Sequence, residues 1–96
     1  ILQTTIPDRM QEEISPDMAV IVNYLYRKRR FKEDRSWPRG KIIRYLDKKL
    51  DGDVSDLLKD MVNMGIIGQA RKKGDIRYWI NPSNGKKILI RFGYSV

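Results

Sequence analysis

The chain of 96 residues contains no cysteine and no histidine. Their absence excludes disulfide frameworks, zinc sites built on thiolates or imidazoles, thiol nucleophiles and histidine general bases. Its apolar runs fall far short of the roughly 18 residues that a transmembrane helix needs, and no signal-peptide pattern precedes them. We therefore expect an intracellular domain that acts without a membrane, a metal or another cofactor.

Catalytic motifs are missing as well. There is no phosphate-binding loop, no nucleophile elbow and no base with a pKa tunable to neutrality. Asp51, Asp53 and Asp56 form a carboxylate cluster of the kind that can hold magnesium or calcium, but the further ligands of a calcium loop are absent. The sequence therefore predicts a protein that is not an enzyme. Its first residue is Ile, which suggests one domain of a longer protein.

Positive charge dominates and is unevenly distributed. The net charge is +8 and the sequence pI is near 9.9. Two basic blocks, residues 27–49 and residues 66–96, flank an acidic block at residues 51–65. This balance indicates a polyanionic partner, although a soluble protein with a positive surface would have the same composition. The abundance of Ile, Lys, Arg and Asp without Cys is also typical of thermophilic proteins.

Three segments carry apolar residues at helical spacing, at residues 15–30, 36–50 and 53–64. Each begins with a residue that typically caps a helix, and the third ends at a glycine suited to a left-handed terminator. The connection between the second and third helices is short, so they should pack as one unit. The predicted caps are Ser15, Ser36 and Asp53, and the predicted terminator is Gly65.

The hydrophobic period changes after the third helix. Alternating apolar residues indicate two strands, and the sequence RKKGD connects them. Gly74 supplies the positive φ that a tight hairpin needs, and Asn81 with Pro82 should end the second strand. The polar segment before the second helix, at residues 31–40, is expected to form a short strand or a loop.

These elements divide the chain into three parts. Residues 1–14 are expected to form an extended N-terminal arm, and residues 15–82 the main domain. Residues 83–96 allow two interpretations. Alternating Ile88, Ile90 and Phe92 favour a strand after an Asn84-Gly85 turn, whereas Ile88, Leu89 and Phe92 would lie on one face of a short helix.

The order of three helices and a two-stranded hairpin resembles the winged helix-turn-helix DNA-binding domain. The match is closest from Val54 to Pro82, where "VSDLLKDMVNMGII" resembles that family's third helix and first wing strand, and "GDIRYWINP" its return strand. The implied fold is α+β and mainly α, a three-helix bundle with a small antiparallel hairpin wing. In that family the third helix enters the major groove, and the wing lies along the backbone or in the minor groove.

The resemblance also implies which residues meet nucleic acid. By position, the third helix and the wing would present Ser55, Lys59, Asn63, Arg71, Lys72, Lys73 and Arg77.

Residue chemistry adds further candidates. Helix N-termini present free backbone N–H groups to phosphate, and the second helix begins with several cations. Strand alternation sends Trp79 outward beside Arg77, unless the arm or the tail covers it. Trp37 should fix the start of a helix, and Tyr24, Tyr26 and Tyr45 should pack between helices. The added binding candidates are Arg39, Lys41, Arg44 and Trp79.

The third helix departs from the family pattern at Asp56 and Asp60. Both stand where DNA-binding members often carry cations or amides, and a carboxylate is repelled by phosphate. Two interpretations are open. Either Asp53 and Asp56 serve the helix start by capping and through the helix dipole, or an Asp accepts a hydrogen bond from a cytosine amino group.

The sequence thus predicts double-stranded DNA binding, by a transcription regulator or a replication-associated factor. The alternative is a winged helix that docks a protein partner or dimerises, within a larger nucleic-acid-processing protein. In that case the acidic third helix would meet a basic partner. The N-terminal arm and the tail with Ile88 and Ile90 would supply apolar contact or an added strand. A third interpretation is single-stranded or structured RNA binding through Trp79.

Overall fold

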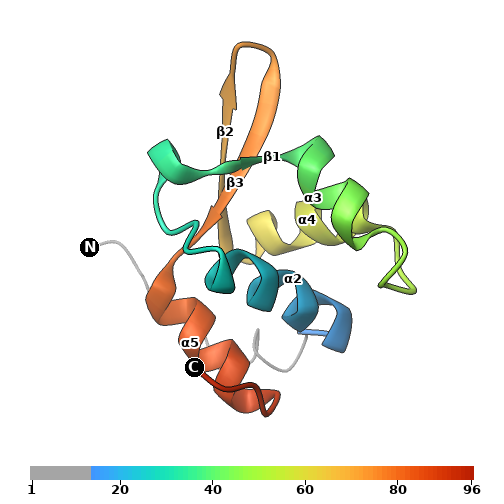
Figure 1. Ribbon diagram of the computed structural model, residues 1–96, viewed down its shortest axis with the longest axis vertical. Coiled ribbons are helices and arrows are strands. Elements are labelled where there is room, and N and C mark those ends of the chain that lie inside the picture. Colours follow the sequence, from blue (N-terminus) through green and yellow to red (C-terminus); the bar gives the residue numbers. More distant parts are fainter. Residues whose placement is uncertain (1–13) are drawn as a thin grey trace.

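The computed structural model describes residues 14–96, which contain four α-helices and a three-stranded antiparallel sheet (Figure 1). The fold is α+β and mainly helical, with strand order β1-β3-β2. The predicted arm lies outside the described residues except for Ile14, which is buried. The elements are α2 (Pro16–Arg27), the 3-10 turn η1 (Glu33–Arg35), β1 (Trp37–Pro38), α3 (Arg39–Leu46), α4 (Val54–Asn63), β2 (Ile67–Lys72), β3 (Asp75–Ile80) and α5 (Pro82–Arg91).

Helix α2 begins as its sequence predicts. The Ser15 hydroxyl accepts a hydrogen bond from the Met18 N–H at 3.2 Å, and Pro16 occupies the first turn. The helix ends earlier than predicted, at Arg27, because Arg29 adopts a left-handed backbone with φ of 55°. Of the four consecutive cations at residues 27–30, only Arg27 therefore belongs to the helix.

The prediction that Ser36 caps the second helix is wrong. Trp37 and Pro38 form an edge strand that pairs with Tyr78 and Arg77 of β3, and α3 starts only at residue 39. The residue before a proline favours extended backbone, and proline is tolerated where a strand needs no donor. Ser36 is buried beside this strand.

Helix α4 follows its local sequence signals closely. The Asp53 carboxylate accepts a hydrogen bond from the Asp56 N–H at 3.2 Å, which confirms the predicted cap. Gly65 ends the helix region with φ of 78°, as predicted. The turn before α4 is tied to α2, since the Gly52 N–H donates to Asp17 at 3.1 Å.

Strands β2 and β3 form the predicted hairpin, which extends beyond the helices (Figure 1). Its turn residues Lys73 and Gly74 have φ of 51° and 85°, the two positive values of a type I′ turn. Tyr78 and Ile80 face the core and are buried. The neighbouring residues on β3 therefore point to the opposite face of the sheet.

The C-terminal segment is a helix, so its interpretation as a strand is wrong. Asn81 accepts hydrogen bonds from the Ser83 and Asn84 N–H groups, and Pro82 occupies the first turn. The predicted Asn84-Gly85 turn is also wrong, because both residues are buried inside α5. Helix α5 packs beside α2 (Figure 1).

The core lies between the sheet and the helices. Its largest fully buried side chains come from the four helices, from β3 and from Ile66, which precedes β2. Among residues 14–96, no helix combines the length and apolar character needed to cross a membrane. The core includes Ile21, Leu25, Leu46, Leu58, Met61, Ile80 and Leu89.

Candidate functional site

The hairpin has two faces, and they separate the predicted cations. Residues paired across antiparallel strands point to the same side of a sheet. Arg71 pairs with Ile76, two residues from the buried Tyr78, so it lies on the core side. Lys72 and Arg77 lie on the other side, which we call the outer face, together with Trp79. The wing cations therefore do not form one surface.

The core side of the hairpin forms a hollow with the start of α3. Its volume is about 280 Å³. Arg39 contributes from the first residue of α3 and Arg71 from β2, so cations distant in sequence meet at one place. No side chain of residues 14–96 caps α3, so its first N–H groups have no side-chain acceptor. This α3–hairpin hollow is lined by Pro38, Arg39, Gly40, Ile43, Arg71, Gly74, Asp75 and Ile76.

Arg39 also connects the α3–hairpin hollow to helix α4. The Arg39 guanidinium donates a hydrogen bond to the Ser55 hydroxyl at 2.5 Å. Lys59 and Asn63 follow Ser55 at intervals of one helical turn and are exposed. The structure thus brings Arg39, Ser55 and Arg71 together, with Lys59 and Asn63 on the adjoining face of α4.

Carboxylates border this surface. Asp56 and Asp60 are exposed on α4 beside Lys59, and Asp75 lines the α3–hairpin hollow. Asp53 is occupied as the helix cap. Within residues 14–96, no three acidic side chains lie close enough together to hold a metal ion. Negative charge on α4 thus adjoins the positive charge of Arg39 and Arg71 in the hollow.

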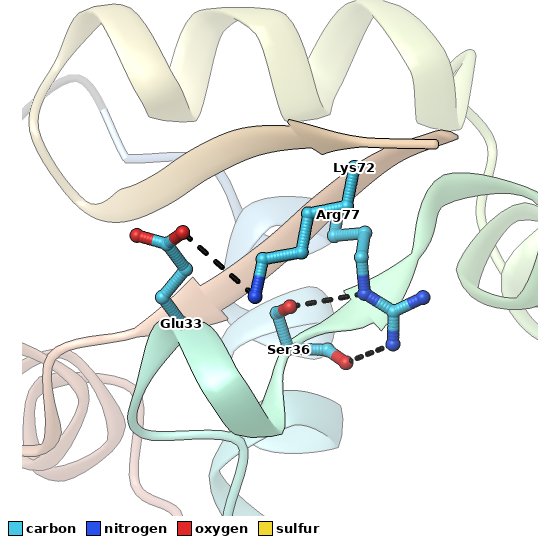
Figure 2. Close-up of polar contacts among 4 residues, drawn as sticks. All are labelled: Glu33, Ser36, Lys72 and Arg77. Atoms are coloured by element: carbon cyan, nitrogen blue, oxygen red, sulfur yellow. Dashed lines mark hydrogen bonds and ion pairs between the residues drawn. The ribbon is translucent and has the colours of Figure 1, made fainter. Parts of the chain in front are cut away.

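Arg77 and Lys72 make intramolecular contacts on the outer face (Figure 2). Arg77 donates from Nε to the Ser36 hydroxyl at 3.1 Å and from a terminal nitrogen to the Ser36 carbonyl at 2.6 Å. Lys72 lies 3.8 Å from the Glu33 carboxylate, and both side chains are about half exposed. These contacts attach η1 and β1 to the hairpin.

Trp79 also packs within the protein, on the outer face. It is opposite Gly68 in the register, and a Cβ at Gly68 would lie 2.3 Å from the indole ring. The ring therefore lies across the β2 backbone, where a side chain would otherwise stand. Trp79 is half-buried there rather than fully presented to solvent.

The remaining α3 candidates lie on different sides of that helix. The Lys41 ammonium is 4.2 Å from the centre of the Trp37 ring, which also receives the Arg30 guanidinium at 4.6 Å. Arg44 is exposed one turn after Gly40, at the side of the α3–hairpin hollow. Lys41 thus points away from Arg39, which is two residues earlier on α3, whereas Arg44 lies between these two directions, three residues after Lys41.

An aromatic cluster lies between α2 and α3, where Tyr24 and Tyr45 pack together as the sequence predicts. Tyr24 and Tyr45 stack with ring centres 4.3 Å apart and planes 12° apart, and Trp37 lies 5.2 Å from Tyr24. Tyr24 is buried as expected of a packing residue, but Tyr45 is 49% exposed. The sequence signal for a cation beside the Tyr45 ring is the spacing of Tyr45 and Lys49, which are about one helical turn apart.

Two tyrosines have pKa values shifted by this environment. Burial raises the pKa of Tyr24, the nearby Tyr45 raises it further and Arg30 opposes the shift. Burial likewise raises the pKa of Tyr78, and Arg39 opposes it. Both phenols therefore stay neutral at physiological pH. The Arg39 charge acts on the core side of the hairpin, consistent with its place in the α3–hairpin hollow.

The site must be interpreted from its own residues, because the chain matches no protein-family model, no curated protein and no solved structure.

Proposed function

We propose that the protein binds double-stranded DNA on the surface formed by the α3–hairpin hollow and the adjoining face of α4. The observation that carries the proposal is the meeting of Arg39 and Arg71 in one hollow. In this proposal the fold is a winged helix in which α2, α3 and α4 form the helical part and the hairpin is the wing. Such a domain would serve a transcription regulator or a replication-associated factor.

The proposed contact is mainly electrostatic. Arg39 and Arg71 present guanidinium groups that match phosphate geometry, and the uncapped start of α3 adds N–H donors. Ser55 is already hydrogen-bonded to Arg39, so it helps to orient that side chain. The carboxylates of α4 oppose close approach to phosphate, which favours binding with little sequence preference.

Adjacent residues on β2 provide a matched test. Arg71→Ala removes a cation from the hollow, whereas Lys72→Ala removes one from the outer face, where it pairs with Glu33. We expect Arg71→Ala to weaken binding to a random 20-base-pair duplex and to reduce the slope of log affinity against log salt by about 1. Lys72→Ala should leave that slope within about 0.3 of the parent value. Fluorescence anisotropy over a salt series measures both.

Two outcomes would contradict the proposal. One is duplex binding by the parent that Arg71→Ala and Arg39→Ala leave unchanged. The other is an equal loss in Arg71→Ala and Lys72→Ala, which would place DNA on both faces of the hairpin. Because both sites are exposed and lie near the hairpin tip, circular dichroism should show parent-like folding in both variants.

Docking of a protein partner or a second copy is the second candidate function. It is favoured by exposed apolar side chains at the C-terminal end, Ile90 at 57% and Val96 at 51% exposure. The tail cannot offer Ile88 for this purpose, because that residue is buried in α5. A dimer on a sizing column that Ile90→Lys converts to a monomer, together with no duplex binding, would select this function instead.

A further inference from the structure

We propose a second site, in which an unpaired nucleotide of a single-stranded nucleic acid stacks on Tyr45. The site is a hollow of about 360 Å³ between α2 and the end of α3. It rests on its own contacts and does not depend on the proposed duplex site. This α2–α3 hollow is lined by Val20, Asn23, Tyr24, Arg27, Lys28, Tyr45, Leu46 and Lys49.

The aromatic wall of the hollow is preorganised. Tyr45 is stacked on the buried Tyr24 at 4.3 Å, so one face of its ring is fixed while the side chain remains 49% exposed. The Lys49 ammonium lies 5.0 Å from the ring centre. Since Tyr24 occupies one face, Lys49 covers the other. That outer face is the one a flat π-system would take.

The charge around the ring suits a phosphate. Arg27, Lys28 and Lys49 line the hollow, and none of the described residues that line it is acidic. Arg27 is held by Asn23, which accepts from its Nε at 3.0 Å. Lys28 and Lys49 are exposed on long side chains. An aromatic surface with cations at its edge is the combination used to bind single strands.

The size and position of the hollow fit this ligand. A volume of about 360 Å³ lies within the range of roughly 300 to 1,000 Å³ typical of small-ligand sites. Residues on a helix advance by about 100° each, so Tyr45 points away from Ile43, which lines the α3–hairpin hollow. The two hollows therefore lie on different sides of α3, and a duplex in the first leaves the second accessible.

The binding mode follows from these contacts. A base stacks on the outer face of Tyr45 and displaces the Lys49 ammonium, which then pairs with the phosphate of the same nucleotide. Lys28, which follows the last residue of α2, faces the next phosphate. The contact uses the π-face of the base and carries no hydrogen-bond code, so binding should tolerate every base.

Single-strand binding by Tyr45 and Lys49 variants tests the proposal. The probes are fluorescein-labelled dT12 and rU12, measured by anisotropy in low salt. Tyr45→Ala should weaken binding by about 5- to 100-fold, the range seen when a stacking aromatic is truncated. Tyr45→Trp should retain binding, and its fluorescence should be quenched as the base stacks. The tighter of the two probes identifies whether the natural strand is DNA or RNA.

A pair of lysines supplies the matched control. Lys49 lines the hollow, whereas the neighbouring Lys48 is exposed and does not. Lys49→Ala should weaken dT12 binding more than Lys48→Ala, although both remove the same charge. Equal effects of the two, or parent-like affinity in Tyr45→Ala, would overturn the proposal. Arg71→Ala tests the duplex site separately, since Arg71 is remote from this hollow.

Discussion

Gly68 and Trp79 show how one small residue determines the position of a large one. They are directly opposite each other on β2 and β3, and the indole occupies the space that a Cβ at Gly68 would need. The next outer-face position of β2 is Ala70, opposite Arg77. Gly68 thus allows the large Trp79 side chain to lie across β2, whereas Arg77 reaches Ser36 beside β1.

Replacing Gly68 with Ala should therefore destabilise the fold. The added Cβ would lie 2.3 to 2.7 Å from three indole atoms, so Trp79 has to move. We expect a loss of about 1–3 kcal/mol in the free energy of unfolding, measured by urea denaturation. Gly40→Ala is the control, because a Cβ there has no described atom within 4 Å and alanine favours the helix. Parent-like stability in Gly68→Ala would show that the indole is free to move.

Single residues predicted local structure correctly where the group that they contact lies within a few residues in the sequence. The Asp53 cap and the Gly65 terminator both act within a few residues, and both are confirmed. Ser36 has an equally good local signal for a cap, but its hydroxyl accepts from Arg77, 41 positions away. No sequence pattern contains that contact, because it exists only once β1 has paired with β3.

At the scale of elements, η1 and β1 are attached to the hairpin by side chains. Strand β1 has only two residues, which gives it few backbone hydrogen bonds to β3. The two bonds from Arg77 to Ser36 supplement that short pairing, and the Lys72–Glu33 ion pair lies at the surface (Figure 2). This segment leads directly into α3, so its attachment positions Arg39.

Ser36→Ala should weaken this attachment. It removes the acceptor for Arg77 Nε in a largely buried setting, which costs about 1–2 kcal/mol of unfolding free energy. Glu33→Gln breaks only the half-exposed ion pair and should cost about 0.5 kcal/mol or less. Thermal unfolding of the two variants measures the difference. Equal and small losses would mean that β1 is held by its backbone pairing alone.

Helix α5 marks the limit of element prediction from this sequence. Asn81 and Pro82 end β3 as predicted, yet the same two residues also start a helix. The apolar run of three residues that follows fits a strand or a helix by period alone. In the structure Ile88 and Leu89 are both buried, whereas Ile90 is exposed. Two consecutive buried residues fit a helix with one side packed against α2, and they do not fit the alternation of a strand.

At the scale of the whole molecule, the basic groups lie on several surfaces. Arg39 and Arg71 border the α3–hairpin hollow, Lys72 and Arg77 lie on the outer face, and Lys49 is beside Tyr45. The sequence predicts the net charge of +8 but not this division. The division depends on strand register and helix rotation, and a change of one residue in either would regroup the charges. It is the reason for proposing two contact surfaces.

The buried tyrosines make the stability of the whole molecule sensitive to alkaline pH. The pKa values of Tyr24 and Tyr78 are raised, chiefly by burial, so the folded protein holds these protons more tightly than the unfolded chain. The pKa of tyrosine in an unfolded chain is about 10. The stabilisation by the neutral phenols is thus complete below about pH 10 and is lost as the pH rises from there through the raised values.

Tyr78→Phe should reduce this alkaline loss, because phenylalanine cannot ionise. The measurement is the change in unfolding free energy between pH 8 and pH 11 from urea titrations of the parent and the variant. Lysines also lose charge in this range, but they do so in both proteins, so the difference between the two changes isolates Tyr78. The variant should lose less stability than the parent. An identical loss in both would show that the Tyr78 phenol is as free to ionise in the folded state as in the unfolded chain.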